Sequence, residues 1–127
     1  MPAPGAMEFL DIHHVQLAMP AGAEAVAEGF YADLLGLSRL DKPEALRGRG
    51  GCWFGSSHLQ VHLGVDPNFA PARKAHPAFL VSALEPLERR LETAGVPIVR
   101  DTQLLGYRRF YVADPFGNRL EFIERAS

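Results

Sequence analysis

Apolar and polar side chains alternate from residue 9 to residue 19. His14 and Gln16 fall on one side of this segment, and Val15 and Leu17 fall on the other. A period of two residues over this length predicts a β-strand whose two faces differ. A proline and a glycine within residues 20–22 end the strand.

The pattern then changes to a helical period. Val26, Phe30 and Leu34 recur every fourth residue before Gly36, which predicts an amphipathic helix over residues 23–35. Three short strand candidates follow, at residues 37–40, 51–54 and 59–65. Beyond a proline-containing linker the same order returns, with a strand at 76–81, a helix at 84–94, and strands at 97–101, 108–113 and 119–123.

This order predicts an α+β fold built from two βαβββ modules. We expect a flexible tail at 1–8 and one domain over 9–127, with module one at 9–65, a linker at 66–74 and module two at 75–125. A four-stranded sheet with a helix on one face leaves its other face open. Two such sheets can pair into an open eight-stranded barrel around a central pocket, which the open faces line.

Strand alternation then predicts which side chains reach that pocket. Leu120 and Phe122 form an apolar pair, so Glu121 between them points to the open face. The same reasoning places four metal-capable residues on open faces: His14, His62, His76 and Glu121. Imidazoles with one carboxylate suit a divalent Zn, Fe, Ni, Co or Mn ion, and His62 and Glu121 are also candidate catalytic groups. Any one of these residues alone would more often be a surface or hydrogen-bonded side chain, so the interpretation depends on all four together.

Further open-face residues are candidates for the substrate pocket: Gln16, Trp53, Gln60, Arg109 and Tyr111. One residue of the Arg108–Arg109 pair should face the pocket, where a guanidinium could hold a carboxylate or phosphate. The alternative is an ordinary pair of surface arginines.

Composition narrows the class of protein. The formal net charge is −2 and the basic residues do not run in blocks, so we expect neither a nucleic-acid partner nor an anionic membrane partner. The chain has one cysteine, Cys52, which excludes an intrachain disulfide and favours a reducing, cytoplasmic location.

Three segments resemble one family. Residues 12–17 (IHHVQL) resemble the opening strand of the vicinal oxygen chelate superfamily, which includes glyoxalases, bleomycin resistance proteins and ring-cleaving dioxygenases. Residues 30–37 (FYADLLGL) are similar to its helix signature, and residues 111–121 (YVADPFGNRLE) resemble its closing hairpin.

The resemblance implies a divalent metal held by residues of the first, fourth, fifth and eighth strands, which match His14, His62, His76 and Glu121. It also implies a homodimer, with the pocket either within one chain or shared between two. Glyoxalase I commonly has a glutamate where this chain has His62, which argues against that particular enzyme. Fosfomycin resistance transferases resemble the set of two histidines and a glutamate, but their potassium loop has no clear match here.

Three functional hypotheses therefore remain. The first is a metal-dependent lyase, isomerase or dioxygenase that acts on a small molecule with neighbouring oxygens. The second is a metal-free protein that binds a cationic drug in an aromatic groove, as bleomycin resistance proteins do. The third is a module without a ligand, because the fold alone does not specify the reaction.

Overall fold

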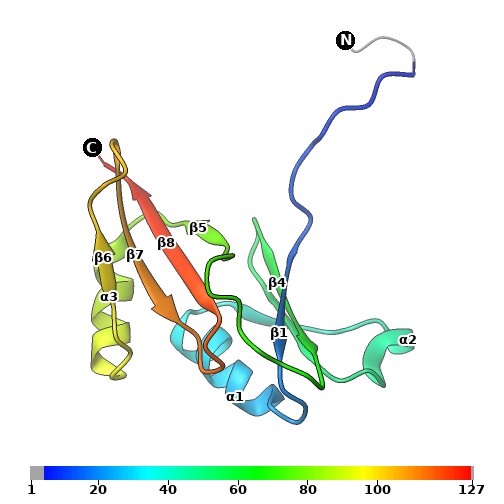
Figure 1. Ribbon diagram of the computed structural model, residues 1–127. Helices are drawn as coiled ribbons and strands as arrows, with labels where there is room; N and C mark the ends of the chain where they lie inside the picture. Colours follow the sequence, from blue (N-terminus) through cyan, green and yellow to red (C-terminus); the bar gives the residue numbers. More distant parts are fainter. Residues whose placement is uncertain (1–4, 127) are drawn as a thin grey trace.

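The computed structural model describes residues 5–126 and contains two four-stranded sheets, each with helical segments (Figure 1). Module one contributes the strands β1 (Val15–Met19), β2 (Ser38–Leu40), β3 (Cys52–Gly55) and β4 (Gln60–Val65). Module two contributes β5 (Ala78–Leu80), β6 (Val99–Asp101), β7 (Tyr107–Ala113) and β8 (Arg119–Arg125). The helices are α1 (Glu24–Glu28), α2 (Glu44–Arg47) and α3 (Leu84–Thr93), and α1 continues directly as the π-helix η1 (Gly29–Leu34).

The two sheets have the same topology, in the orders β1-β4-β3-β2 and β5-β8-β7-β6. In each sheet the first strand is parallel to the fourth, and the other pairs are antiparallel. The α+β fold with a repeated strand–helix–strand–strand–strand order is therefore as predicted. No helix among residues 5–126 is long and apolar enough to cross a bilayer.

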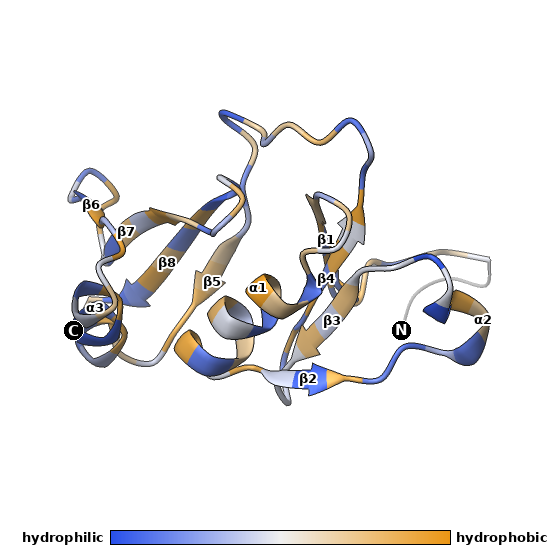
Figure 2. Cartoon of the chain, turned by 90° about the horizontal axis from the view of Figure 1, so that it is seen from below, coloured by the Kyte–Doolittle hydropathy of each residue, from blue (hydrophilic) through white to orange (hydrophobic). Residues whose placement is uncertain are grey.

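Among residues 5–126 the two sheets share no hydrogen-bonded strand pair, so they do not join into one barrel within the described chain. Figure 2 shows α1 lying between them. The buried apolar side chains of both sheets belong to one core cluster with those of the helical segments. These core residues include Phe54, Val61, Leu63, Phe110, Leu120 and Phe122. The central pocket expected between two facing open sheets is thus replaced, inside one chain, by a helix-filled core.

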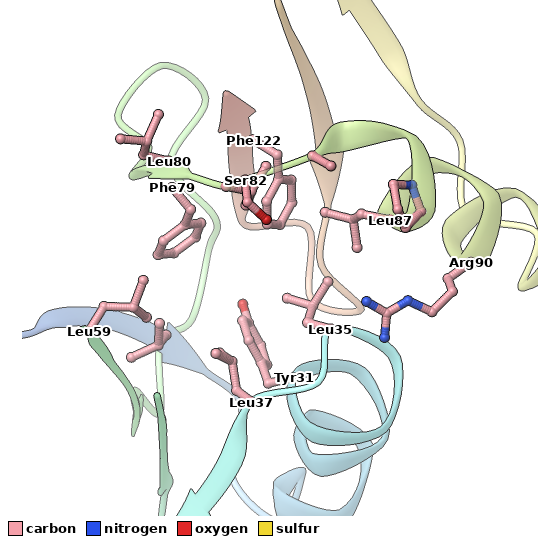
Figure 3. Close-up of a pocket in the computed structure, with 14 residues that line it drawn as sticks. Tyr31, Leu35, Leu37, Leu59, Phe79, Leu80, Ser82, Leu87, Arg90 and Phe122 are labelled. Carbon is pink, nitrogen blue, oxygen red and sulfur yellow. The ribbon is translucent and has the colours of Figure 1, made fainter. Parts of the chain in front are cut away.

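An apolar cavity of about 290 Å³ remains in this layer. Figure 3 shows Tyr31 and Leu35 of module one facing Phe79, Leu87 and Phe122 of module two across it. This cavity lies on the helix side of both sheets, away from the predicted metal ligands. It is therefore distinct from the pocket that the sequence predicts.

The turn between β7 and β8 ties the modules together. The Tyr31 hydroxyl donates a hydrogen bond of 2.6 Å to Oδ2 of Asp114, and Asn118 Nδ2 donates one of 2.8 Å to the carbonyl of Ala18. Burial, reinforced by the Asp114 carboxylate, raises the pKa of Tyr31 above its ordinary value, so this phenol remains a neutral donor.

Two elements differ from the sequence-based expectation. The first strand begins at Val15 rather than near residue 9, because its pairing with β4 starts at Val15 opposite Val61. The first helix buries Ala27, Phe30 and Tyr31, whereas Val26 of the predicted stripe is 53% exposed. The π-type bond from Leu35 N–H to Phe30 O shifts the buried face away from an ideal α-helical period. Short α2 lay outside the predicted elements, and residues 1–4 of the predicted tail lie outside the described part.

Candidate functional site

Three aromatic rings stack on the open face of the first sheet. The strand register places Gln16 and Trp53 opposite His62, so their side chains share its face. The His62 ring is parallel to the Trp53 indole, at 3.9 Å between centroids and 4°, and to the His14 ring, at 4.1 Å and 15°. The His62 ring on β4 and the His14 ring, one residue before β1, thus lie side by side.

The environment of His62 keeps it neutral. Its side chain is buried, and this burial, with the charges of His14 and His13, lowers its pKa to about 4. Only a neutral imidazole can bind a metal, so His62 has the ligand-competent form across the whole neutral range. Its Nε2–H donates a 2.9 Å hydrogen bond to Oε1 of Gln60, which orients the ring.

This low pKa predicts a specific dependence of stability on pH. The unfolded chain protonates His62 below about pH 6.5, whereas the folded chain protonates it only near pH 4. The free energy of unfolding should therefore decrease as the pH is lowered from about 6.5 to about 4. This decrease should be smaller in His62→Gln. Urea unfolding with a chelator present measures both slopes, and exposed His58→Gln is the control that should follow the wild type. Equal slopes for the wild type and His62→Gln would contradict the assignment.

The open face of the second sheet carries the other two predicted ligands. His76 Nε2 lies 2.8 Å from Oε1 of Glu121, whose side chain is buried. Arg109 approaches the other carboxylate oxygen at 3.2 Å and also pairs with Asp101 at 3.1 Å. The Tyr111 ring meets His76 edge to face at 5.4 Å.

The donor atoms of this pair fit a cation. His76 Nδ1 lies 2.8 Å from the carbonyl oxygen of Lys74, which can only accept, so Nδ1 carries a proton. Nε2 lies only 2.8 Å from a carboxylate oxygen, and a positive charge must lie between these two atoms. A proton supplies it at the 2.8 Å hydrogen-bond distance, and a divalent ion could replace that proton if the two atoms moved to the roughly 3.0–3.4 Å that separates two ligands about 2.1 Å from one metal. The carbonyl contact to the remote ring nitrogen is also the usual support of a ligating histidine.

Within one chain these residues form two pairs and not one centre. Among residues 5–126, no three His, Cys, Asp or Glu side chains come together in a way that could hold a metal. The structure brings His14 to His62 and His76 to Glu121, but α1 and η1 lie between the two sheets. The convergence of all four on one point is therefore not found inside a single chain.

Other pocket candidates lie on the same open faces. Gln16 and His76 line one groove where β1 meets the end of the linker, and Arg109 faces the site while Arg108 pairs with Glu124 on the opposite face. Within residues 5–126, the buried Nε of Arg109 has no hydrogen-bond partner.

Two contributing residues were missed from the sequence. Asp101 pairs with Arg109, and Arg119 stacks its guanidinium 4.2 Å from the Tyr111 ring centroid. The signal for Arg119 was its position two residues before Glu121 on the same strand face. Arg119 thus adds a second cation to the open face of the second sheet.

Comparison with known proteins matches this architecture to one family. The model of the Glyoxalase/Bleomycin resistance protein/Dioxygenase superfamily matches residues 11–122. Among solved structures, a glyoxalase family protein from Bacillus anthracis is 42% identical, with a TM-score of 0.92 over 95% of this chain and 99% of that one.

More distant structures share the fold. A glyoxalase/dioxygenase from Nostoc punctiforme is 20% identical, with a TM-score of 0.76 over 100% of this chain and 97% of that one. The fosfomycin resistance protein FosX from Listeria monocytogenes is 13% identical, with a TM-score of 0.73 over 94% and 96%. Among curated proteins, no sequence matches the chain. From the family match and the Bacillus anthracis structure we conclude that the chain belongs to the glyoxalase/bleomycin resistance protein/dioxygenase superfamily.

Proposed function

We propose that this protein is a metal-dependent enzyme that acts on a small molecule with neighbouring oxygen atoms, and that a homodimer completes its site. The observation that carries this proposal is the division of the ligands into two pairs on two separate open faces. Each pair alone has too few donors for a stable site. In the proposed dimer, His14 and His62 of one chain meet the partner's His76 and the partner's Glu121.

The combined donor set is three imidazoles and one carboxylate. This set suits Zn, Fe, Ni, Co or Mn, and such an ion, when bound, polarises substrate oxygens and stabilises negative charge that develops on them. The superfamily membership supports lyase, isomerase or dioxygenase chemistry of this type.

The other open-face side chains have roles that follow from their chemistry. Arg109 and Arg119 flank Tyr111 and would bind an anionic part of the substrate, since Arg109 keeps one buried donor free. His62 is either the fourth ligand or, where the metal is held by the other three residues, a proton acceptor whose pKa of about 4 lets it return the proton readily. Because His62 occupies a position where glyoxalase I commonly has a glutamate, we expect a reaction other than that of glyoxalase I.

Metal analysis tests this proposal directly. Protein purified without added metal should contain about one divalent ion per chain, as measured by elemental mass spectrometry. His76→Ala and Glu121→Ala should each lose most of it, because removing one of four ligands typically weakens binding by orders of magnitude. His58→Ala is the matched control, since His58 is exposed beside the β3–β4 turn. A metal-free wild type with no thermal shift across the divalent series would refute the proposal.

Mixing two defective variants tests the shared site. In a heterodimer of His62→Ala and His76→Ala chains, one site carries both substitutions and the other carries neither. We expect such heterodimers to bind about one ion per dimer, whereas either variant alone binds much less. A site within one chain would show no rescue, and a fully loaded monomer would contradict the dimeric arrangement.

A further inference from the structure

The apolar cavity between the two modules is large enough to hold a small molecule. Its volume is about 290 Å³, and sites for small molecules begin at roughly this size. An apolar cavity of about 150 Å³ holds one benzene molecule, so a cavity twice as large has room for an apolar body of roughly ten carbon atoms. Protein interiors contain few voids larger than a water molecule, so a space of this size is unusual for packing alone.

The wall of this cavity is apolar on both sides. Leu35 and Leu59 of module one face Phe79 of module two across it (Figure 3). The Tyr31 hydroxyl at the wall already donates its proton to Asp114, so it does not offer that proton to an occupant. The body of a bound molecule must therefore be apolar.

A charged side chain stands at the edge of the wall. In Figure 3 the Arg90 guanidinium extends from α3 toward Leu35, and its Nη1 lies 3.5 Å from the position that a Cβ on Gly36 would take. None of the ion pairs among residues 5–126 includes Arg90, whereas the neighbouring Arg89 pairs with Glu85. A guanidinium without a carboxylate beside an apolar cavity favours an occupant with one negative charge.

We propose that this cavity binds a small organic carboxylate. The carboxylate group pairs with the Arg90 guanidinium, and an apolar body of about ten carbon atoms lies toward Leu59 and Phe79. In this position the molecule contacts both modules at once. It replaces an empty apolar space with packed contacts and gives Arg90 an ionic partner.

The cavity lies back to back with the proposed metal-binding residues. Val61 lines the cavity, and the next residue of β4, His62, points to the open face. In β8 the same relation holds between Phe122 and Glu121. The two sites are thus on opposite faces of each sheet, and binding in the cavity requires no metal. A protein without metal would lose the proposed function and leave this inference standing.

Calorimetric titration of chelator-treated protein with decanoate tests the cavity. We expect one decanoate to bind per chain with a Kd of about 10–100 μM. Octanoate and hexanoate should bind more weakly, by roughly tenfold for every two methylene groups removed, because each buries less apolar surface. Acetate has no apolar body and should show no binding. No saturable decanoate binding below about 1 mM, or equal affinities across the series, would overturn the inference.

Two adjacent arginines of α3 test the contact with the carboxylate. Arg90→Gln should weaken decanoate binding about three- to tenfold, because it removes the charge that faces the carboxylate. Arg89→Gln removes the same charge outside the cavity and should leave the affinity unchanged. Uncharged decanol should bind equally to the wild type and to Arg90→Gln. Both arginines are exposed, so we expect both variants to fold. Equal decanoate affinities of the wild type and Arg90→Gln would contradict the proposed contact.

Nuclear Overhauser effects from decanoate to the protein locate the bound molecule independently of affinity. We expect contacts with Leu35, Phe79 and Leu87, which line the cavity. Contacts with Tyr111 instead would place decanoate on the open face of the second sheet, beside Arg109, and would overturn the inference. A dimer dissociation constant that rises with decanoate would assign the cavity to a contact between two copies, which would overturn it as well.

Discussion

Replacing Gly51 with alanine is expected to destabilise the protein by at least about 3 kcal/mol. Gly51 has φ of +87°, where residues with a side chain are strained, and a Cβ added there would lie 2.3 Å from the carbonyl oxygen of Leu63. That oxygen belongs to the backbone of β4, so it cannot move without disturbing the sheet that holds His62. Urea unfolding at a fixed protein concentration measures the loss.

Gly48 offers a matched control in the same loop. Its φ is −71° and no atom lies within 4 Å of a built Cβ, so Gly48→Ala should be neutral or stabilise by up to about 1 kcal/mol. If the free energies of unfolding of Gly51→Ala and Gly48→Ala differed by less than about 0.5 kcal/mol, the inference that the backbones at Gly51 and Leu63 approach closely would be contradicted.

Removal of the Asp114 carboxylate is the second large effect that we expect, at about 3–5 kcal/mol for Asp114→Ala. Its Oδ2 accepts hydrogen bonds from the Tyr31 hydroxyl and Asn118 Nδ2, and its Oδ1 accepts from the backbone N–H groups of Phe116 and Asn118. Asp114 is 4% exposed, so water cannot readily replace the carboxylate for these donors.

The variant Tyr31→Phe measures the contribution of one hydrogen bond to the total effect of the Asp114 carboxylate. It removes a single donor and should cost about 1–2 kcal/mol, less than half the effect of Asp114→Ala. Thermal unfolding monitored by calorimetry gives both values. Equal losses in the two variants would show that Asp114 acts through Tyr31 alone.

The direction of side chains within each strand was predictable from the sequence. Alternation depends only on neighbours along the chain, and the register accordingly puts Gln16, Trp53 and His62 on one face and Tyr111 and Glu121 on the other sheet's open face. The same local rule would have found Arg119, whose significance lay in its spacing from Glu121.

The relative placement of the two open faces was not predictable, because it depends on contacts between distant residues. The sequence around Asp114 predicts only a turn, yet the hydrogen bond that Asp114 accepts from Tyr31 joins residues 83 positions apart. The bond from Asn118 to Ala18 spans 100. These bonds, and the helix between the sheets, decide that four candidate ligands form two pairs in one chain.

The prediction of which face of the first helix is buried was wrong for a local reason. A stripe of every fourth residue assumes uniform α-helical geometry, but η1 has wider turns, so Val26 lies in solvent and Tyr31 in the core. The predicted start of the first strand was wrong because a strand needs a hydrogen-bonded partner strand as well as an alternating sequence. Residues 9–14 have the alternating pattern of a strand, but they pair with no strand of the described chain.

The burial of Cys52 has a practical consequence. The only thiol in the chain is fully covered in β3, and burial raises its pKa, so it is both hidden and protonated in the folded protein. A thiol reagent can therefore modify it only during transient openings of module one. The native chain thus carries its own kinetic probe of local opening, and labelling rates would report on one half of the molecule without any introduced residue.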